Sequence, residues 1–242
     1  MNFHLQVTKS VAAFVAVGAV IFGAGSQPAL ANTGTDSGGW KLLPNATPLG
    51  YSLDQMASET ALFNTSGNDL LNYPNTPFQL LYVDWSTASV ETASDGGLRF
   101  TGGNHFTVRP GKFFYVPLWN FNDGGFNDGG ITEAYGPYPT TRSDAATFFF
   151  GPEHLGGYDF KIFVDGRRED VSARYVSTPV VTPTLHNGAT HIITLAAFLT
   201  PLTPGSHTVT ITGGVSGQAI RDVEGVSYMH MNFTYYVDVI AP

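Results

Sequence analysis

Cysteine is absent from the 242-residue sequence. No disulfide can hold the chain together, so an exported form must depend on the burial of apolar side chains. Charged residues are also scarce, at 12% of the chain, whereas hydrophobic residues make up 43% and aromatic residues 13%. This composition is typical of a packed globular protein and argues against disorder over most of the chain.

Basic residues are few as well. The sequence contains 11 Lys and Arg against 19 Asp and Glu, which gives a formal net charge of −8. Only Arg167 and Arg168 come close to a basic cluster, and binding to phosphates requires several clustered basic side chains. We therefore expect no nucleic-acid partner.

The N-terminal segment has the features of an export signal. Lys9 precedes an almost uncharged apolar run over residues 11–23. This run is shorter than the ~20 residues that a spanning helix needs, and no second run of that kind follows. Small residues before the end of the segment match a signal-peptidase site. We expect a signal peptide over residues 1–31, cleaved after Ala31, and a mature chain that does not span a membrane; an uncleaved anchor is the alternative.

The mature chain divides into a linker and one domain. Residues 32–49 begin with small polar side chains and predict a flexible linker. Residues 50–242 are enough for one substantial core, and a single β-sandwich of this size is ordinary. A helix is predicted over residues 53–63, where Ser52 and Gln55 form a capping box and apolar residues recur at helical spacing.

Most of the domain has the two-residue period of β-strands. Residues 229–239 are the clearest case, because apolar side chains alternate there with a polar outer face. That outer face begins with Tyr228, His230 and Asn232. Residues 131–147, rich in Pro, Tyr and Thr, predict a long loop. The sequence therefore predicts an all-β fold: a single two-layer antiparallel β-sandwich, jelly-roll-like, with one short N-terminal helix.

Three motifs resemble those of a group of exported bacterial β-sandwich proteins. They are Pro-Gly-Lys at 110–112 followed by Pro117, Val-Asp-Gly at 164–166, and Pro-Leu-Thr-Pro-Gly-Ser-His-Thr at 201–208. The resemblance extends over about residues 50–239, although this chain lacks the tryptophan-rich N-terminal helix of the group. Because the group is functionally uncharacterised, the resemblance implies a fold and no catalytic residues.

A cupin is the other β-sandwich class that the sequence resembles. The stretch over residues 109–117 is similar to the start of a cupin's second motif, which continues to a metal-binding His. Here the next residues are Leu118, Trp119 and Asn120. The missing His argues against a cupin.

A tandem repeat, Phe-Asn-Asp-Gly-Gly at residues 121–125 and again at 126–130, is the first candidate site. We expect it to form a surface loop. Calcium binds carboxylate, amide and backbone oxygens, and glycine lets a loop curl its carbonyls inward. The predicted metal ligands are Asp123, Asp128 and Glu133. Two aspartates fall short of a full shell, so a glycine loop whose Asn and Asp side chains cap their own turns is the alternative.

Aromatic side chains around the repeat indicate carbohydrate binding. Sugars stack their apolar faces on aromatic rings, and Asn or Asp side chains then accept hydroxyl hydrogens. The predicted ligand-binding residues are Trp119, Tyr135, Tyr138, Asn122 and Asn127. The alternative is that Trp119 and the two Phe residues of the repeat belong to the core.

Signatures of catalysis are weak. Residues 214–218, Gly-Val-Ser-Gly-Gln, miss the nucleophile-elbow pattern at the last position. A glycosidase needs two carboxylates at a defined separation, which the sequence does not reveal. The candidate pairs are Glu153 with Asp159 and Asp222 with Glu224.

The favoured function is that of an exported, non-catalytic β-sandwich module in the periplasm, at the cell surface or secreted. It would bind carbohydrate or have a structural role, with a glycan or another cell-surface component as partner. Calcium is the one candidate cofactor. A hydrolase or lyase acting on polysaccharide is the alternative.

Overall fold

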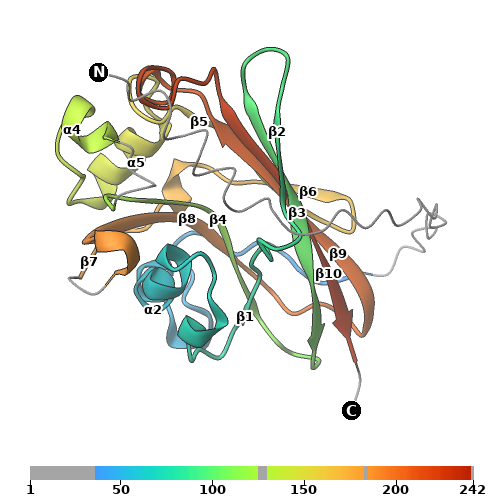
Figure 1. Ribbon diagram of the computed structural model, residues 1–242. Coiled ribbons are helices and arrows are strands. Elements are labelled where there is room, and N and C mark those ends of the chain that lie inside the picture. Colours follow the sequence, from blue (N-terminus) through green and yellow to red (C-terminus); the bar gives the residue numbers. More distant parts are fainter. Residues whose placement is uncertain (1–35, 125–129, 183–184, 241–242) are drawn as a thin grey trace. The chain divides into compact units, whose positions relative to one another are not determined.

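The computed structural model describes residues 36–124, 130–182 and 185–240, and its fold is mostly β (Figure 1). Every described helix and strand lies in one unit, Gly38–Pro242. The predicted signal peptide lies outside the described residues and stays a prediction. Within the described residues, each helix is too short or too polar to cross a bilayer.

The strands form two sheets. In spatial order, the larger sheet contains β2 (Ser89–Thr92), β3 (Leu98–Val108), β10 (Met229–Val239), β9 (Gly205–Val215), β5 (Gly157–Val164) and β6 (Arg167–Asp170). The smaller sheet contains β1 (Gln79–Leu80), β4 (Phe114–Asn122), β8 (His191–Leu199) and β7 (Val180–Val181). Side chains of the two sheets meet in the core, where the Trp119 ring of β4 packs edge-on against Phe160 of β5 with centroids 6.1 Å apart.

The alternation predicted for residues 229–239 is confirmed. In β10, five apolar side chains from Met231 to Val239 are buried, while Asn232 and Tyr236 on the opposite face are exposed. The strand therefore has one face in the core and one face in solvent, which is how a half-buried strand satisfies its alternating sequence.

Two strand pairs depart from the all-antiparallel prediction. β10 pairs with β3 in parallel, with His230 opposite Arg99 and Val239 opposite Val108. β1 also pairs with β4 in parallel. Turn signals in a sequence report hairpins between consecutive strands, whereas β3 and β10 lie far apart in the chain and no local signal fixes their direction.

The helix predicted at residues 53–63 is present as α2 (Leu53–Thr65). Its capping box forms: the Ser52 Oγ accepts a hydrogen bond from the Gln55 N–H at 3.2 Å, and the Gln55 Oε1 accepts one from the Ser52 N–H at 2.8 Å. The helix packs against β8 and β7 of the smaller sheet (Figure 1), and buries Met56 and Phe63 completely.

The long loop predicted over residues 131–147 is wrong, and so is the expectation of a single helix. This segment contains α4 (Ile131–Tyr135) and most of α5 (Arg142–Phe150). Thr141 caps α5 by accepting a hydrogen bond from the Asp144 N–H. Ala145, Phe148 and Phe149 are buried at helical spacing, so the apolar period was in the sequence but was obscured by the preceding Pro and Tyr residues.

Short 3₁₀ helices and one π-helix complete the fold. They are the 3₁₀ turns η1 (Pro48–Gly50), η2 (Leu70–Asn72), η3 (Ala173–Tyr175) and η4 (His186–Gly188), and the π-helix η5 (Ile220–Glu224).

Part of the predicted linker belongs to the folded unit. Gly38 and Lys41 form β-bridges to Leu202 and Leu199, and the Leu42 N–H donates to the Phe198 carbonyl at 2.9 Å. Residues 38–42 therefore lie alongside the end of β8 and the residues that come after it. The polar composition of residues 32–39 gave no sign of this pairing, because the bonds use backbone groups that every residue carries.

Candidate functional site

The first half of the tandem repeat ends a strand. Phe121 and Asn122 are the last residues of β4, and both are buried, which corrects the expectation that the loop begins at residue 121. Residues 125–129, which include the predicted ligands Asn127 and Asp128, lie outside the described residues.

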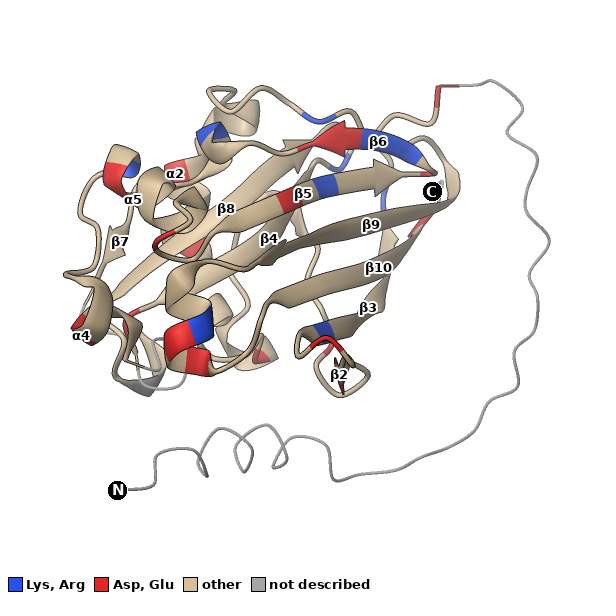
Figure 2. Cartoon of the chain, turned by 90° about the horizontal axis from the view of Figure 1, so that it is seen from above, with Lys and Arg blue, Asp and Glu red and all other residues tan. Residues whose placement is uncertain are grey.

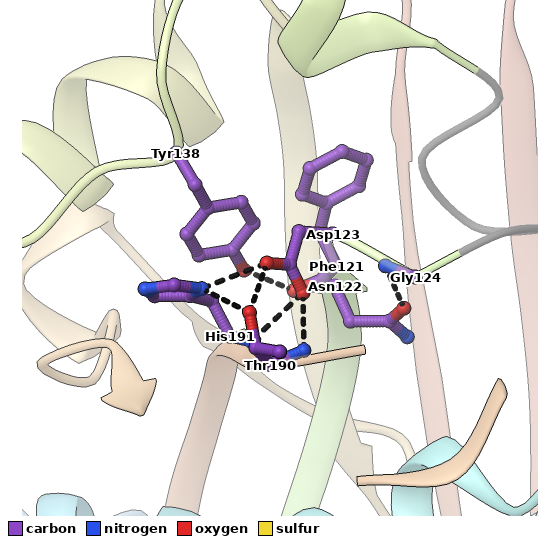
Figure 3. Close-up of polar contacts among 7 residues, drawn as sticks. All are labelled: Phe121, Asn122, Asp123, Gly124, Tyr138, Thr190 and His191. Carbon is purple, nitrogen blue, oxygen red and sulfur yellow. Dashed lines mark hydrogen bonds and ion pairs between the residues drawn. The ribbon is translucent and has the colours of Figure 1, made fainter. Parts of the chain in front are cut away.

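Asp123 is held by four hydrogen-bond donors from the start of β8 (Figure 3). Its Oδ1 accepts from the backbone N–H groups of Thr190 and His191, both at 2.7 Å. Its Oδ2 lies 2.7 Å from the Thr190 Oγ1 and 2.7 Å from the His191 Nδ1. We call these three residues the Asp123 cluster. It joins the end of β4 to the start of β8.

The same contacts set the charge of Asp123. Burial alone would raise the pKa of this carboxyl, but the N–H and hydroxyl donors of His191 and Thr190 outweigh burial and hold the pKa below its ordinary value. A cation at Asp123 would have to replace donors that already satisfy the carboxylate.

The calcium prediction depends on residues that the structure does not describe. Among the described residues, no group of three or more His, Asp and Glu side chains is placed to hold a metal ion. Glu133 is exposed on α4, and Asp128 falls in the gap at residues 125–129. Calcium binding by the repeat therefore stays a prediction.

Two of the aromatic residues predicted to bind sugar pack within the fold. The Tyr138 ring is buried and stacks on Phe121 with centroids 5.9 Å apart, and its hydroxyl donates to the Phe121 carbonyl (Figure 3). Trp119 is partly buried against the core. Asn122 is buried, and its Oδ1 accepts from the Gly124 N–H at 3.0 Å. The alternative, that Trp119 and the Phe residues of the repeat belong to the core, agrees with the burial of Phe121. Sugar binding by Trp119, Tyr138 and Asn122 stays a prediction.

A shallow groove on the solvent side of the larger sheet contains the second candidate site. Its volume is about 420 Å³. We call it the tyrosine groove. It is lined by Arg99, Phe100, Thr101, Tyr158, Tyr228, His230 and Asn232. Three of these residues were predicted on the outer face of the last strand. The others come from β3, which pairs with β10, and from β5, which lies on the far side of β9.

Glycines support both tyrosine rings of this groove. A Cβ atom at Gly97 would overlap the ring of Tyr228, and one at Gly214 would lie 2.8 Å from the Cζ and the hydroxyl of Tyr158. Each ring therefore lies across a glycine of the sheet or its turn. This close approach is possible only where the backbone carries no side chain.

Polar contacts fix the orientation of Tyr228. Its hydroxyl donates to Asp95 at 3.0 Å and accepts from the Arg99 Nε at 3.2 Å. The same hydroxyl is the main reason that the pKa of Asp95 lies below its ordinary value. The ring is thus held at both its face and its polar tip, which leaves it preorganised to receive a ligand.

His230 supplies a neutral polar group beside the rings. Burial lowers the pKa of this imidazole below its ordinary value of about 6.5, so the ring is uncharged at pH 7. Its Nε2 lies 3.3 Å from the Thr212 Oγ1, and its ring centroid lies 6.1 Å from that of Tyr158. A neutral imidazole can both donate and accept a hydrogen bond.

A second groove of about 580 Å³ lies beside η5, and we call it the Glu153 groove. Its lining residues are Tyr135, Pro152, Glu153, His154, Gln218 and Arg221. The Tyr135 hydroxyl and the Gln218 Nε2 donate to Asp222, so this carboxylate is already occupied at the rim. π-Helices are rare and frequently occur at functional sites. This groove is therefore the candidate site for a catalytic activity.

Two of the sequence motifs meet in the structure. Asp165 of Val-Asp-Gly accepts from the Thr208 N–H at 2.8 Å, and its Oδ2 lies 2.7 Å from the His207 Nδ1. The other ring nitrogen of His207 lies 2.8 Å from the Thr203 carbonyl oxygen. Both nitrogens are therefore used within the fold, and the motifs specify a contact between a hairpin and a turn.

Comparison with known proteins adds little. No protein-family model and no curated protein matches the chain. Among solved structures, the chain is similar to the crystal structure of dimeric latent PorU from Porphyromonas gingivalis, with 16% sequence identity and a TM-score of 0.24. The similarity covers 64% of this chain and 11% of that chain, so this chain spans a small part of the other protein's length. At this TM-score the similarity supports no conclusion about fold or function.

Proposed function

We propose that this chain is an exported, non-catalytic β-sandwich module that binds an uncharged carbohydrate in the tyrosine groove. The observation that carries the proposal is the pair of tyrosine rings, Tyr158 and Tyr228, each lying across a glycine, in a groove that also contains uncharged polar side chains. Ligand sites commonly combine aromatic surface with a few placed polar groups, and this groove has both.

The polar side chains that line the groove with the two rings suit sugar hydroxyls. Thr101 and Asn232 lie opposite each other in neighbouring strands, and His230 lies two residues from Asn232 along β10. A hydroxyl, an amide and a neutral imidazole each donate and accept hydrogen bonds, as sugar hydroxyls do. A shallow groove also leaves much of its ligand exposed, which suits part of a glycan better than a small enclosed metabolite.

The charge distribution favours an uncharged ligand. In Figure 2 the charged residues lie on β5, β6 and β3 and in the helices and loops, while β9 and β10 are almost free of them. Among the described residues that line the groove, Arg99 is the one with a charged side chain. It lies opposite Glu91 of β2 and shares Tyr228 with Asp95. With its positive charge balanced by neighbours, the groove has no surplus charge to attract a polyanion.

The test is a glycan array with the mature protein, followed by calorimetry with the best ligand shortened to a disaccharide. Replacing either ring, by Tyr228→Ala or Tyr158→Ala, should weaken binding roughly tenfold, which corresponds to about 1.4 kcal/mol of lost contact. Tyr236→Ala is the matched control, because Tyr236 is an exposed tyrosine on the same face of β10 but outside the groove. An array with no ligand, or equal affinities for all these variants, would refute the proposal.

Hydrolysis is the competing function, and the Glu153 groove is where it would occur. Glu153 is an exposed carboxylate that lines this groove, so a substrate bound there could come within hydrogen-bond reach of it, as a catalytic acid or base requires. Release of reducing ends from any array ligand, abolished by Glu153→Gln, would replace the binding proposal by a hydrolase. Binding without turnover would retain it.

A further inference from the structure

The solvent face of the larger sheet continues beyond the tyrosine groove. Along β10, Asn232, Thr234 and Tyr236 point to the same side as His230, because successive side chains of a strand alternate between its faces. Tyr236 is 53% exposed. The strand thus joins the tyrosines of the groove to a further exposed tyrosine on one face.

The surface between these aromatic residues has few large side chains and is rich in hydroxyl groups. At Gly103, opposite Thr234 in β3, a Cβ atom would overlap the Thr234 carbonyl oxygen, so no side chain can rise there. On the other side, Thr210 lies opposite Thr234 in β9, with their hydroxyl oxygens 3.0 Å apart. β9 adds Thr208 and Thr212 on the same face.

The length of this surface matches a chain of sugars. Eight residues separate Tyr228 from Tyr236, and at about 3.3 Å per residue of strand they span roughly 26 Å. A single sugar or a disaccharide is much shorter than this distance. An extended oligosaccharide would be needed to contact both aromatic ends.

The two strands at the centre of this surface, β9 and β10, are also uncharged over most of that distance. Between residues 229 and 237 β10 has no Asp, Glu, Lys or Arg, and β9 has none at all. The one acid of β10, Asp238, lies beyond Tyr236, where it accepts from the Ser206 hydroxyl at 2.6 Å and lies 2.9 Å from the His105 Nε2. An uncharged chain could cross the strands without desolvating a carboxylate.

We infer that the binding site is a track along β10, from Tyr158 and Tyr228 to Tyr236, and that its ligand is an extended, uncharged, β-linked polysaccharide. An extended sheet face favours β-1,4-linked chains, whose sugar rings lie in a ribbon. The inference rests on the proposed function, and specifies its ligand class and the direction in which the ligand lies.

The experiment measures affinity against ligand length. Cello-oligosaccharides and chito-oligosaccharides of two to six sugars are titrated by calorimetry into the mature protein and its variants. For the wild type, affinity should rise at least tenfold from the disaccharide to the hexasaccharide. Tyr236→Ala should lose about tenfold for the hexasaccharide and nothing for the disaccharide, whereas Tyr228→Ala should lose affinity for both. Tyr236→Phe, which keeps the ring, should behave like the wild type.

The outcomes separate the inference from the proposed function. Equal affinity for all lengths, or an unchanged hexasaccharide affinity in Tyr236→Ala, would overturn the track and leave the groove as a short site. No binding to either series at any length would overturn the ligand class inferred here, while the glycan array alone decides the proposed function. Unchanged melting temperatures of the Tyr236 variants would show that a lost affinity does not come from unfolding.

Discussion

The Asp123 cluster and the tyrosine groove contain similar polar groups, but only those of the groove remain open to a ligand. In the cluster, all four contacts of the Asp123 carboxylate go to residues of the same fold. In the groove, the rings of Tyr158 and Tyr228 are fixed from below by glycines, and their other faces line an open depression. The cluster therefore contributes to stability, and the groove is available to a ligand.

The difference shows that residue type alone does not identify a site. Aspartate beside glycine predicts a cation site, yet Asp123 lies where two backbone N–H groups at the start of β8 need an acceptor. An unpaired N–H in such a position would cost roughly 1–3 kcal/mol, and a cation that displaced these donors would have to offset that loss. Availability to a ligand depends on what the surrounding chain has already bound.

The largest effect on stability is expected from removing the Asp123 carboxylate. Asp123→Ala leaves the donors of Thr190 and His191 without their partner, so the free energy of unfolding should fall by roughly 2–4 kcal/mol. Urea denaturation measures this. Glu133→Ala, at an exposed acid of α4, is the control and should change stability by no more than about 0.5 kcal/mol. Equal effects would show that the cluster has no special role.

The pH dependence of stability should report the same carboxylate. The pKa of Asp123 is lower in the folded than in the unfolded chain, so its contribution is present above the unfolded value of about 3.9 and is lost as the pH falls through the folded value. The stability gap between wild type and Asp123→Asn should be constant near pH 7 and should narrow below about pH 4. Urea midpoints at several pH values give the gap, and a gap that widens in acid would contradict the assignment.

Binding in the groove should be sensitive to a single methyl group. Gly97→Ala places a Cβ where the Tyr228 ring lies, so the ring must move and the affinity for carbohydrate should fall about tenfold. Gly96→Ala is the matched control: it strains the same turn, at φ +83°, but has its nearest neighbour at the Ser227 Oγ, 3.7 Å away. Calorimetry on both variants separates loss of the ring position from loss of the turn.

The smallest effect is expected from calcium. If the repeat binds the ion as its sequence predicts, millimolar calcium should raise the melting temperature, because a ligand that binds only the native state stabilises it. We expect a gain below about 1 kcal/mol, since Asp123 is already satisfied by its donors. Asp128→Ala should abolish the gain. No shift in the wild type would leave the glycine-loop alternative.

Local patterns in the sequence were enough for several elements. The capping box of Ser52 and Gln55 predicted α2, and the alternation over residues 229–239 predicted both faces of β10. Both depend on residues within one turn or one strand, where geometry follows directly from spacing. The polar outer face that includes His230 and Asn232 could be identified in the same way.

Only the tertiary structure decided which strands lie side by side and which polar groups remain available. Arg99, Tyr158 and Tyr228 line one groove because β3, β10, β9 and β5 are neighbours in the sheet, although the parallel pairing of β3 with β10 joins segments more than 100 residues apart. Asp123 meets His191 for the same reason, through the pairing of β4 with β8. Strand order is a long-range property: the backbone groups that pair are the same in every residue, so the sequence determines the elements, while their packing determines which side chains meet.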